Sequence, residues 1–470
     1  MAEKINADLL VVGGGPGGYT AAFRAADLGL SVTLLEKQER LGGVCLNVGC
    51  IPSKTLLHAA SVIEDAEKIS SYGVKYGKPE IDLDAMRQNK DTVVKKLTDG
   101  LELLCNARKI KIVKGAGKFK DSRTVSVEGN SEVAEIGFKN CIIAAGSRPV
   151  KLPIFPEDPG IWDSTDALEV KEVPGKLLVV GGGIIGLEMA TVYHSLGSSV
   201  TVVEMLDQII PPADADVVKP LFRKLKKSLE AILLETEIVK AEKTGNSFTV
   251  TMKDKKGTEK TAVYDRILVA VGRRPNTASV EPEKAGIETE KGFIKVNDRM
   301  QTSVDGIYAI GDITGNPMLA HRASHQGKIA AEVISGLKSA FTPMTIPSVA
   351  YTSPEVAWMG ITEKDAVRDN IPFKKGVFPW AASGRALSAD NALGSTKVLF
   401  DPETGRIIGA GIAGYNAGEL ISEAVLAMEM GCDAEDIGST VHPHPTLAET
   451  IAFASEAAAG TVTDILPPKA

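Results

Sequence analysis

The sequence predicts an α/β protein with several packed domains. Its 470 residues are about three times the usual length of one domain, so three or four domains are expected. One pattern occurs twice, starting at Leu9 and at Leu177: an apolar run, a glycine cluster, helix-compatible sequence and a second β-rich run. The last part of the chain instead alternates β-rich runs with an Ala-rich helical pattern. We therefore expect two Rossmann-like dinucleotide-binding domains and an α+β C-terminal domain.

Composition and charge exclude several classes of protein. Hydrophobic residues make up 44% of the chain and charged residues 24%, which is ordinary for a globular protein and unlike disordered, collagen-like or membrane sequences. Lys and Arg number 53 against 60 Asp and Glu, so nucleic acid is not an expected partner. No stretch approaches the roughly 18 consecutive apolar residues of a membrane span. The N-terminus resembles neither a signal peptide nor a transit peptide, so a cytoplasmic location is expected.

Each copy of the repeated pattern ends in a glutamate at the same distance from its glycines. In the first copy the strand, the three glycines and the closing run are Leu9 to Val12, then Gly13, Gly15 and Gly18, then Thr33 to Glu36. In the second copy they are Leu177 to Val180, then Gly181, Gly183 and Gly186, then Thr201 to Glu204. The glutamate lies 18 residues after the third glycine in both. One such pattern is weak support for a nucleotide site, whereas two with identical spacing support each other.

The pattern suits a close approach of the backbone to a pyrophosphate. The first glycine permits a tight turn, the second leaves room for the phosphates, and the third lets the helix pack on the strand. The helix N-terminus then offers unpaired N–H groups and positive partial charge. The closing glutamate accepts hydrogen bonds from ribose hydroxyls and would repel a 2′-phosphate, so Glu204 favours NAD over NADP. A purely structural turn from strand into helix is the alternative, and it is less favoured for two copies.

The two halves differ in length. Related segments close them at Gly146 and at Gly272, which lie 133 and 91 residues after the first glycine of each fingerprint. The first half is therefore 42 residues longer, and specialised chemistry is expected in this surplus. Two cysteines, Cys45 and Cys50, lie at its start.

The cysteine pair is expected at the start of a helix. The pattern from Thr55 to Ile69 is helical, with Pro52 in its first turn, so Cys50 would lie at the helix N-terminus. That place stabilises a thiolate, and Lys54 adds a cation on the same helix face. Cys45 would lie in a glycine-bounded loop that folds back toward Cys50. The spacing therefore favours a redox couple.

Other interpretations of the cysteines are less favoured. A count of five is odd and too low for a secreted disulfide scaffold, which indicates a reducing compartment. Two unbonded core cysteines are one alternative for the close pair, and a metal site is another, although no second ligand pair lies near in sequence. We expect no metal. The remaining thiols are expected to be small core residues: Cys105, Cys141 and Cys432.

The rest of the chain completes the domain plan. The run Ile307 to Gly311 predicts a strand that presents Asp312 at its end. Further on, strands are predicted at Ser395 to Phe400 and at Ile407 to Gly411, and a helix at Gly418 to Met430. The expected domains are 1–148, 149–275, 276–346 and 347–470. No Gly/Ser-rich or Pro-rich linker separates them, so they should pack together.

A second group with acid–base character lies near the C-terminus. Thr446 and Glu449 have the spacing of a capping box, and the proline after His444 biases that histidine to an extended conformation. In the simpler interpretation Glu449 is only a helix cap and His444 only a surface turn residue. A thiol substrate, however, needs a base that titrates near neutral pH, and the chain has six histidines. These patterns alone leave the identity of the base open.

Taken together, the motifs resemble the class I pyridine nucleotide-disulfide oxidoreductases. The resemblance covers essentially the whole chain in order: both fingerprints, Gly42 to Lys54, Ala309 to Asp312, and His442 to Glu449. It implies an FAD-binding domain that carries a redox disulfide, an NAD-binding domain, a central domain that completes the FAD site, and a C-terminal dimerisation domain. The implied FAD contacts are Gly13, Gly15, Gly18, Glu36, Lys54, Gly117, Asp312 and Ala320. The implied NAD contacts are Gly181, Gly183, Gly186, Glu204, Ile238 and Gly272.

The resemblance also implies an activity. Within the family, the motifs are most similar to those of homodimeric enzymes that oxidise protein-bound dihydrolipoamide to lipoamide and reduce NAD+ to NADH. By that resemblance His444, oriented by Glu449, is the base and reaches the active site of the partner subunit. The substrate thiolate is then expected to attack Cys45, the more accessible sulfur, while Cys50 lies beside the flavin. Lys54 and Glu188 are expected to form an ion pair near the flavin.

The implied partners carry lipoyl groups, either the acyltransferase of a 2-oxoacid dehydrogenase complex or the carrier protein of glycine cleavage. Three alternative functions fit the motifs less well. A glutathione-type reductase would use NADP, with basic residues after the second β-run, and Val203 to Met205 offers none. A mercuric-type reductase would end in adjacent cysteines, which the C-terminal sequence lacks. A non-catalytic docking flavoprotein would not need the combination of the cysteine pair with His444 and Glu449.

Overall fold

The computed structural model describes residues 3–466, which divide into two compact units. The first unit comprises residues up to 56 together with 82–150 and 272–342. The second comprises 57–81, 151–271 and the residues from 343 onward. The chain passes from the first unit to the second inside helix α3 (Cys50–Lys68), whose first residues belong to the unit with the first fingerprint. The four predicted domains remain a prediction.

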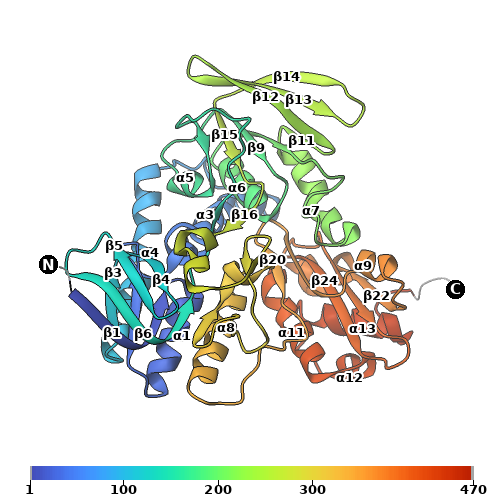
Figure 1. Ribbon diagram of the computed structural model, residues 1–470. Coiled ribbons are helices and arrows are strands. Elements are labelled where there is room, and N and C mark those ends of the chain that lie inside the picture. The colour runs from blue at the N-terminus through green and yellow to red at the C-terminus, as the bar shows by residue number, and fades with distance from the viewer. Residues whose placement is uncertain (1–2, 467–470) are drawn as a thin grey trace. The chain divides into compact units, whose positions relative to one another are not determined.

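The first unit is built on a seven-stranded sheet (Figure 1). Its parallel strands, in spatial order, are β3 (Lys111–Lys114), β2 (Val32–Glu36), β1 (Glu3–Val12), β6 (Val133–Ile143) and β19 (Ile307–Ala309). Two antiparallel strands extend it beside β6: β5 (Thr124–Glu128) and β4 (Ala116–Asp121). Residues Leu9 to Val12 are all buried, as is typical of a parallel strand covered on both faces.

Helices cover the sheet of the first unit. They are α1 (Pro16–Asp27), α2 (Gly43–Val48), α4 (Leu83–Ala107), α8 (Ala320–Ile334) and the start of α3. Helices α1 and α8 pack closely because a glycine lies on each. A Cβ on Gly327 would lie 2.4 Å from the carbonyl oxygen of Gly17, so only glycine permits this approach. The short elements are β7 (Ser147–Pro149), β16 (Arg273–Pro275), η2 (Thr277–Val280), η3 (Pro282–Ala285), β17 (Thr289–Glu290), β18 (Phe293–Ile294) and η4 (Gly311–Thr314).

The second unit repeats the same plan in residues 151–271. A five-stranded parallel sheet has the order β11 (Ala231–Leu233), β10 (Ser199–Val203), β9 (Lys176–Val180), β15 (Arg266–Val269) and β8 (Ile161–Trp162). The helices are α5 (Ser164–Glu169), α6 (Ile184–Ser195) and α7 (Ala215–Ser228). A separate antiparallel sheet is formed by β12 (Thr236–Thr244), β13 (Ser247–Asp254) and β14 (Glu259–Tyr264). Two copies of one strand order follow two copies of one sequence pattern.

The C-terminal part of the second unit is α+β. Its antiparallel sheet has the order β20 (Ser348–Ala350), β21 (Glu355–Gly360), β24 (Ile407–Gly414), β23 (Ser395–Phe400) and β22 (Lys374–Pro379). The helical elements are α9 (Glu363–Arg368), η5 (Trp380–Ala382), α10 (Gly384–Ser388), α11 (Ala417–Met430), α12 (Ala434–Ser439) and α13 (Glu449–Ala459). The strands and the helix predicted here are confirmed, with β24 three residues longer than expected. The predicted α/β class with an α+β C-terminal region is therefore confirmed.

The 42-residue surplus of the first half consists mainly of helix. Between β2 and β3 the chain forms α2, α3, the short η1 (Ile69–Tyr72) and α4, whereas α7 is the one helix between β10 and β11. The predicted helix from Thr55 to Ile69 begins five residues earlier, at Cys50, and ends at Lys68. The surplus thus places a helix N-terminus at the cysteine pair.

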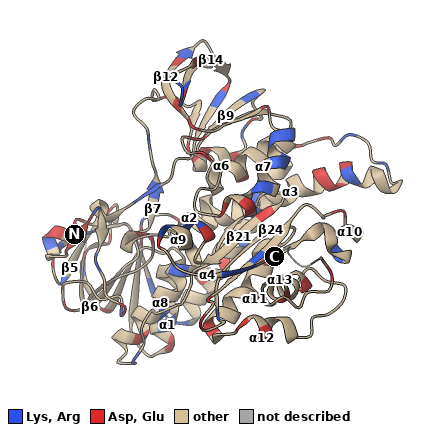
Figure 2. Ribbon diagram, turned by 90° about the vertical axis from the view of Figure 1, so that its right-hand side faces the viewer, with Lys and Arg blue, Asp and Glu red and all other residues tan. Residues whose placement is uncertain are grey.

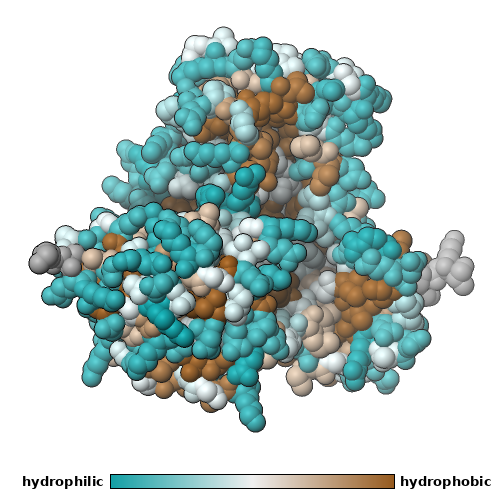
Figure 3. All heavy atoms as spheres, in the orientation of Figure 1, coloured by the Kyte–Doolittle hydropathy of each residue, from teal (hydrophilic) through white to brown (hydrophobic). Residues whose placement is uncertain are grey.

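No helix among residues 3–466 is long and apolar enough to cross a membrane. The face in Figure 3 is mostly hydrophilic, with hydrophobic atoms in separate patches.

Candidate active site

The cysteine pair lies where two helices of the first unit meet. Cys45 is inside the short helix α2, and Cys50 is the first residue of α3. Gly49 separates the helices with an irregular backbone, and a Cβ there would lie 2.8 Å from the carbonyl oxygen of Val44. The chain can therefore fold back tightly only with glycine at this position. The expected loop around Cys45 was wrong, because residues 43–48 complete a helical turn before the fold-back.

Both cysteines are free thiols, and they interact. Hydrogen bonding to Cys50, followed by burial, raises the pKa of the Cys45 thiol. Cys45 is half-buried because α2 packs on the core of the first unit, whereas Cys50 is exposed. The expectation that Cys45 is the more accessible sulfur is therefore wrong for the chain by itself. The reason is that Cys50 occupies the open first position of its helix.

Sequence reasoning missed a tyrosine beside this pair. Burial raises the pKa of Tyr19, and its electrostatic interaction with Cys45 and Cys50 raises it further. Tyr19 and Cys45 also pack against the same apolar core. Tyr19 lies one turn after Gly15 in α1. Its place in the first turn of the fingerprint helix is the sequence feature that could have pointed to it.

The first glycine fingerprint forms a cradle at the N-terminus of α1. Gly13 has a φ of +106°, and a Cβ on it would lie 2.3 Å from the carbonyl oxygen of Ala144. A Cβ on Gly18 would lie 1.8 Å from the carbonyl oxygen of Gly13, so the helix packs directly on the strand end. The buried Glu36 accepts hydrogen bonds from the N–H groups of Gly14 at 2.7 Å and Gln38 at 2.8 Å. These bonds fix the carboxylate at the edge of the cradle.

The second fingerprint repeats this geometry bond for bond. Gly181 has a φ of +109°, and a Cβ on Gly186 would lie 2.2 Å from the carbonyl oxygen of Gly181. Glu204 accepts hydrogen bonds from the N–H groups of Gly182 at 2.7 Å and Leu206 at 2.9 Å. The two cradles therefore present a glutamate in the same way.

The middle glycines test whether these cradles fit a dinucleotide. A Cβ on Gly183 would meet no described atom within 4 Å, and one on Gly15 would make an ordinary contact of 3.7 Å with Gly43. Packing within the chain therefore does not require glycine at either position, whereas phosphates close to the backbone would. Gly15 and Gly183 are also the N-caps of α1 and α6, and no described side chain caps either helix. The free N–H groups fit a pyrophosphate.

Two further predicted FAD contacts lie at chain turns of the first unit. Asp312 is in η4 directly after β19 and accepts a hydrogen bond from the Ser147 hydroxyl, which in turn accepts one from Arg273 Nε at 2.7 Å. Ala320 is the first residue of α8. Gly117 has a reason of its own to be glycine, because a Cβ there would lie 2.7 Å from the Leu35 side chain.

The other predicted residues lie in both units. Gly272 has a φ of +110°, and Ile238 is half-buried in β12. Lys54 lies in the first turns of α3, and its amine donates to the Ser53 hydroxyl at 3.3 Å. Glu188 is 3% exposed in α6 and accepts a hydrogen bond from the N–H of Tyr351 at 3.1 Å. The expected Lys54–Glu188 ion pair remains a prediction.

The candidate base lies in the loop between α12 and α13. His444 Nδ1 is 2.8 Å from Glu449 Oε1, and the His444 side chain is 79% exposed. Because Nδ1–H donates a hydrogen bond to the carboxylate, Nε2 keeps its lone pair and can accept a proton. The predicted capping box was wrong: α13 begins only at Glu449, and the Thr446 hydroxyl donates to the carbonyl of Pro443. One half of it is present, since Glu449 accepts from the Thr446 N–H at 2.7 Å.

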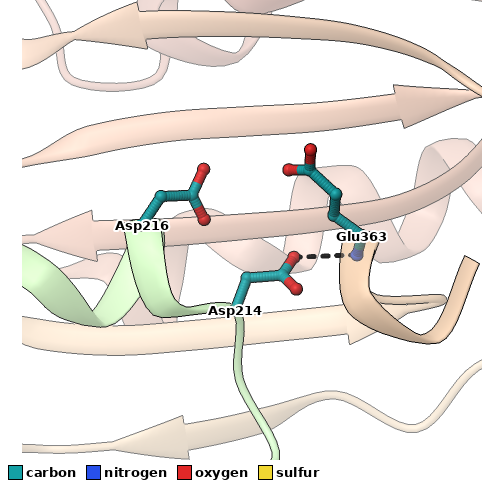
Figure 4. Close-up of side chains that lie close together, drawn as sticks. All are labelled: Asp214, Asp216 and Glu363. Carbon is teal, nitrogen blue, oxygen red and sulfur yellow. Dashed lines mark hydrogen bonds between the residues drawn. The ribbon is translucent and has the colours of Figure 1, made fainter. Parts of the chain in front are cut away.

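A second cluster of charged groups lies in the second unit, away from these residues in sequence. Figure 4 shows Asp214 and Asp216 at the start of α7 and Glu363 in α9, with side chains near one another. The Lys397 amine lies 2.8, 2.6 and 3.1 Å from these three carboxylates in turn. An ammonium group thus already supplies a cation here, so we assign no metal to the cluster.

Comparison with known proteins defines the class. The description "pyridine nucleotide-disulphide oxidoreductase" matches residues 7–327, and the dimerisation domain of the same family matches residues 346–455. The chain belongs to this family. Its members' use of FAD and NAD(H) agrees with the two cradles.

Two relatives and one solved structure show which members of this family are similar to the chain. The dihydrolipoyl dehydrogenase of Vibrio cholerae is 53% identical over 472 residues, covering 100% of this chain and 99% of the relative. The dihydrolipoyl dehydrogenase of Haemophilus influenzae is 51% identical, covering 100% and 98%. A copper(II) complex of the flavoprotein disulfide reductase RclA from Escherichia coli has a TM-score of 0.86 and 27% identity, covering 96% and 99%.

Proposed function

We propose that the chain oxidises dihydrolipoamide to lipoamide and reduces NAD+ to NADH. The observation that carries the proposal is a contacting pair of thiols, Cys45 and Cys50, at a helix start in a chain with two dinucleotide cradles. Full-length relatives more than half identical to the chain are dihydrolipoyl dehydrogenases, which supports the proposal. FAD, when bound in the first cradle, supplies the carrier for two electrons between the thiols and NAD+.

The chemistry of the pair is thiol–disulfide exchange. A substrate thiolate attacks one sulfur of a Cys45–Cys50 disulfide, so a mixed disulfide forms and the bond between the two cysteines breaks. The second substrate thiol then displaces the protein sulfur, closes the lipoamide ring and leaves two protein thiols. These free thiols are the state in the structure. The two protein thiols then give up two electrons and two protons and re-form the Cys45–Cys50 disulfide. NAD+ takes up the two electrons and one proton, and the second proton goes to solvent.

The order of the two sulfurs needs its own test. The resemblance assigns Cys45 to the substrate and Cys50 to the cofactor, whereas Cys50 is the more exposed thiol of the chain by itself. We propose that Cys45 is the attacked sulfur in the FAD-loaded enzyme. Brief alkylation of the NADH-reduced holoenzyme, followed by peptide mass mapping, should label Cys45 first. Preferential labelling of Cys50 would reverse the two roles.

His444 is the proposed base. Glu449 holds the Nδ1 proton, so Nε2 is the atom that accepts a proton from the substrate thiol. Both residues lie in the segment that matches the dimerisation domain, which supports a base that acts across a homodimer. Mixed dimers of a Cys45 variant and a His444 variant should regain part of the activity. If they stay inactive, each site lies within one chain.

The protein that carries the substrate and the cellular location of the enzyme are also proposals. We propose a lipoyl-bearing protein as the partner, either the acyltransferase of a 2-oxoacid dehydrogenase complex or the glycine cleavage carrier, in the cytoplasm. Co-purification of the tagged holoenzyme followed by detection of lipoylated proteins distinguishes the two carriers.

A steady-state assay tests the proposed function directly. The FAD-loaded protein should form NADH from dihydrolipoamide and NAD+, and should react poorly with NADP+ because Glu204 repels a 2′-phosphate. The matched control is Cys432→Ser, which changes a thiol outside the pair. Faster turnover of glutathione disulfide with NADPH would overturn the proposal.

A further inference from the structure

A second histidine anchors the loop that carries the candidate base. The loop runs from Thr440 to Ala448 and joins α12 to α13. The side chain of His442 is only 7% exposed, whereas Val441 is 95% exposed and the His444 side chain 79%. His442 is therefore held against the protein while its neighbours point to solvent.

Both ring nitrogens of His442 face acceptors. Nδ1 lies 2.7 Å from the carbonyl oxygen of Thr440, and Nε2 lies 2.7 Å from Oε1 of Glu423 on α11. A carbonyl and an ionised carboxylate can only accept hydrogen bonds. Either neutral tautomer would leave one ring lone pair against an acceptor oxygen. Only the imidazolium, with a proton on each nitrogen, makes both bonds.

The charged residues in the sequence around the loop are acidic. Between Arg406 and Lys469 the sequence has nine acidic residues and no Lys or Arg. On the three helices that flank the loop they are Glu419, Glu423 and Glu429 of α11, Glu435 and Asp436 of α12, and Glu449 and Glu456 of α13. The acidic positions of α12 are red in Figure 2. A positive ring at His442 therefore lies in an acidic part of the chain, with the Glu423 carboxylate in contact.

We propose that His442 and Glu423 form an ion pair that positions His444. The inference rests on the proposed function, in which His444 is the base. His442 binds the loop to α11, and Glu449 orients the His444 ring from α13. Two glutamates on two helices thus fix one loop, and His442 acts through His444 without touching the substrate. A neutral His442 ring makes only one of the two hydrogen bonds, so it would hold the loop less firmly.

Glutamine at position 423 separates a charge effect from a hydrogen-bonding effect. The amide of Glu423→Gln can accept from a protonated ring or donate to a neutral one, so it satisfies His442 in both states. Glu423→Ala has neither a hydrogen-bond acceptor nor a donor for the His442 ring. Glu419→Gln, on an exposed position of the same helix, removes one negative charge without changing a contact of the ring and is the matched control.

The experiment compares these variants with His442→Phe in the FAD-loaded enzyme. Turnover of dihydrolipoamide is measured from about pH 6 to pH 9, beside NADH-dependent reduction of an artificial acceptor, which needs no base. We expect His442→Phe and Glu423→Ala to lower kcat for dihydrolipoamide about tenfold or more, as a displaced catalytic group does. Their reduction of the artificial acceptor should stay unchanged. Glu423→Gln should keep its activity further into the alkaline range than the wild type, and Glu419→Gln should match the wild type.

Two results would overturn the inference. One is wild-type dihydrolipoamide turnover in His442→Phe. The other is an alkaline profile of Glu423→Gln that coincides with that of the wild type. A readout independent of activity is the nitrogen NMR spectrum of the enzyme labelled with ¹⁵N-histidine at neutral pH. It should show one ring with both nitrogens protonated, and that signal should change in Glu423→Gln. A neutral ring would also refute the pair, whereas absence of wild-type dihydrolipoamide turnover would refute the proposed function instead.

Discussion

Replacing Lys397 by Met should destabilise the second unit, because it removes the cation at the centre of three carboxylates. The Lys397 side chain is 2% exposed in β23, and its amine contacts Asp214, Asp216 and Glu363. Methionine keeps most of the aliphatic volume, so the change tests the charge more than the packing. Burial by itself would lower the pKa of Lys397, but hydrogen bonds to Asp214 and Asp216 outweigh it and raise that pKa. The lysine is therefore charged in the folded protein.

The size of the effect depends on which carboxylate is left without a partner. Asp216 is 50% exposed and Glu363 27% exposed, and Glu363 also pairs with Lys375, so both can be solvated or neutralised. Asp214 is 9% exposed and keeps two backbone donors, Glu363 N at 2.9 Å and Lys364 N at 3.1 Å. Lys397→Met thus leaves one buried carboxylate only partly satisfied. We expect it to lower the free energy of unfolding by about 3 kcal/mol, the low end of the ~3–5 kcal/mol that breaking a buried ion pair costs.

Urea unfolding of the purified holoenzyme, followed by far-UV circular dichroism, measures this loss. The matched control is Lys375→Met, which removes an exposed lysine bound to Glu363 alone and should cost no more than about 1 kcal/mol. Adding Asp214→Asn to Lys397→Met should recover part of the stability, since it removes the stranded charge. Equal midpoints for Lys397→Met and Lys375→Met would refute the reasoning.

The pH dependence of this cluster has a definite sign. Burial alone would raise the pKa of Asp214, but the hydrogen bonds from Lys397 and from two backbone N–H groups outweigh it and lower that pKa below 3.8. A depressed carboxylate contributes stability above its unfolded pKa and loses it as the pH falls through the folded value. Lys397, whose pKa is raised above 10.5, loses its contribution only as the pH rises through the folded value. The cluster is therefore fully effective at neutral pH.

Three further changes separate chemistry, binding and folding. Cys50→Ser should abolish dihydrolipoamide turnover while Cys432→Ser leaves it unchanged; activity in Cys50→Ser would remove that thiol from the mechanism. His444→Gln should slow dihydrolipoamide turnover by about 10²–10⁴-fold and spare reduction of artificial acceptors by NADH; equal losses would point to another base. Gly183→Ala should raise the KM for NAD+ with little change in the thermal unfolding midpoint, because a Cβ there meets no described atom within 4 Å. Gly181→Ala should instead lower the thermal unfolding midpoint, because its Cβ would lie 2.5 Å from the Ala270 carbonyl oxygen. An unchanged KM in Gly183→Ala would argue against a phosphate at that position.

Much of the fold could be predicted because its signals are local. A fingerprint is a short run of residues with one geometry, so its second copy predicted a second cradle with the glutamate in the same place. The helix start at Cys50 could also be predicted, because Pro52 is suited to a first turn. Local patterns were less reliable where the same residues can form two different local structures. Residues 43–48 form a helix in place of a loop, and the Thr446 hydroxyl binds a preceding carbonyl instead of capping α13.

Contacts between distant residues could not be predicted from the sequence. Lys397 meets partners 34 and 181 residues away, and no pattern near it distinguishes it from a surface lysine. Glu423 and His442 are 19 residues apart on either side of α12. Side-chain exposure could not be predicted either, since the relative exposure of Cys45 and Cys50 depends on how α2 packs. Such pairs require the tertiary fold, because only the fold brings their elements together.

The two cradles use the same bonds, so the difference between them must come from what surrounds each. A Cβ on Gly183, the middle glycine of the second cradle, would meet no described atom within 4 Å. A Cβ on Gly15 of the first cradle would lie 3.7 Å from Gly43, the first residue of α2. The helix that carries Cys45 therefore begins at the wall of the first cradle. A dinucleotide held there would lie next to the chain segment that leads to both thiols. In the second copy, the corresponding stretch between β10 and β11 forms α7 alone. The helical surplus thus gives one of two similar nucleotide sites a redox partner.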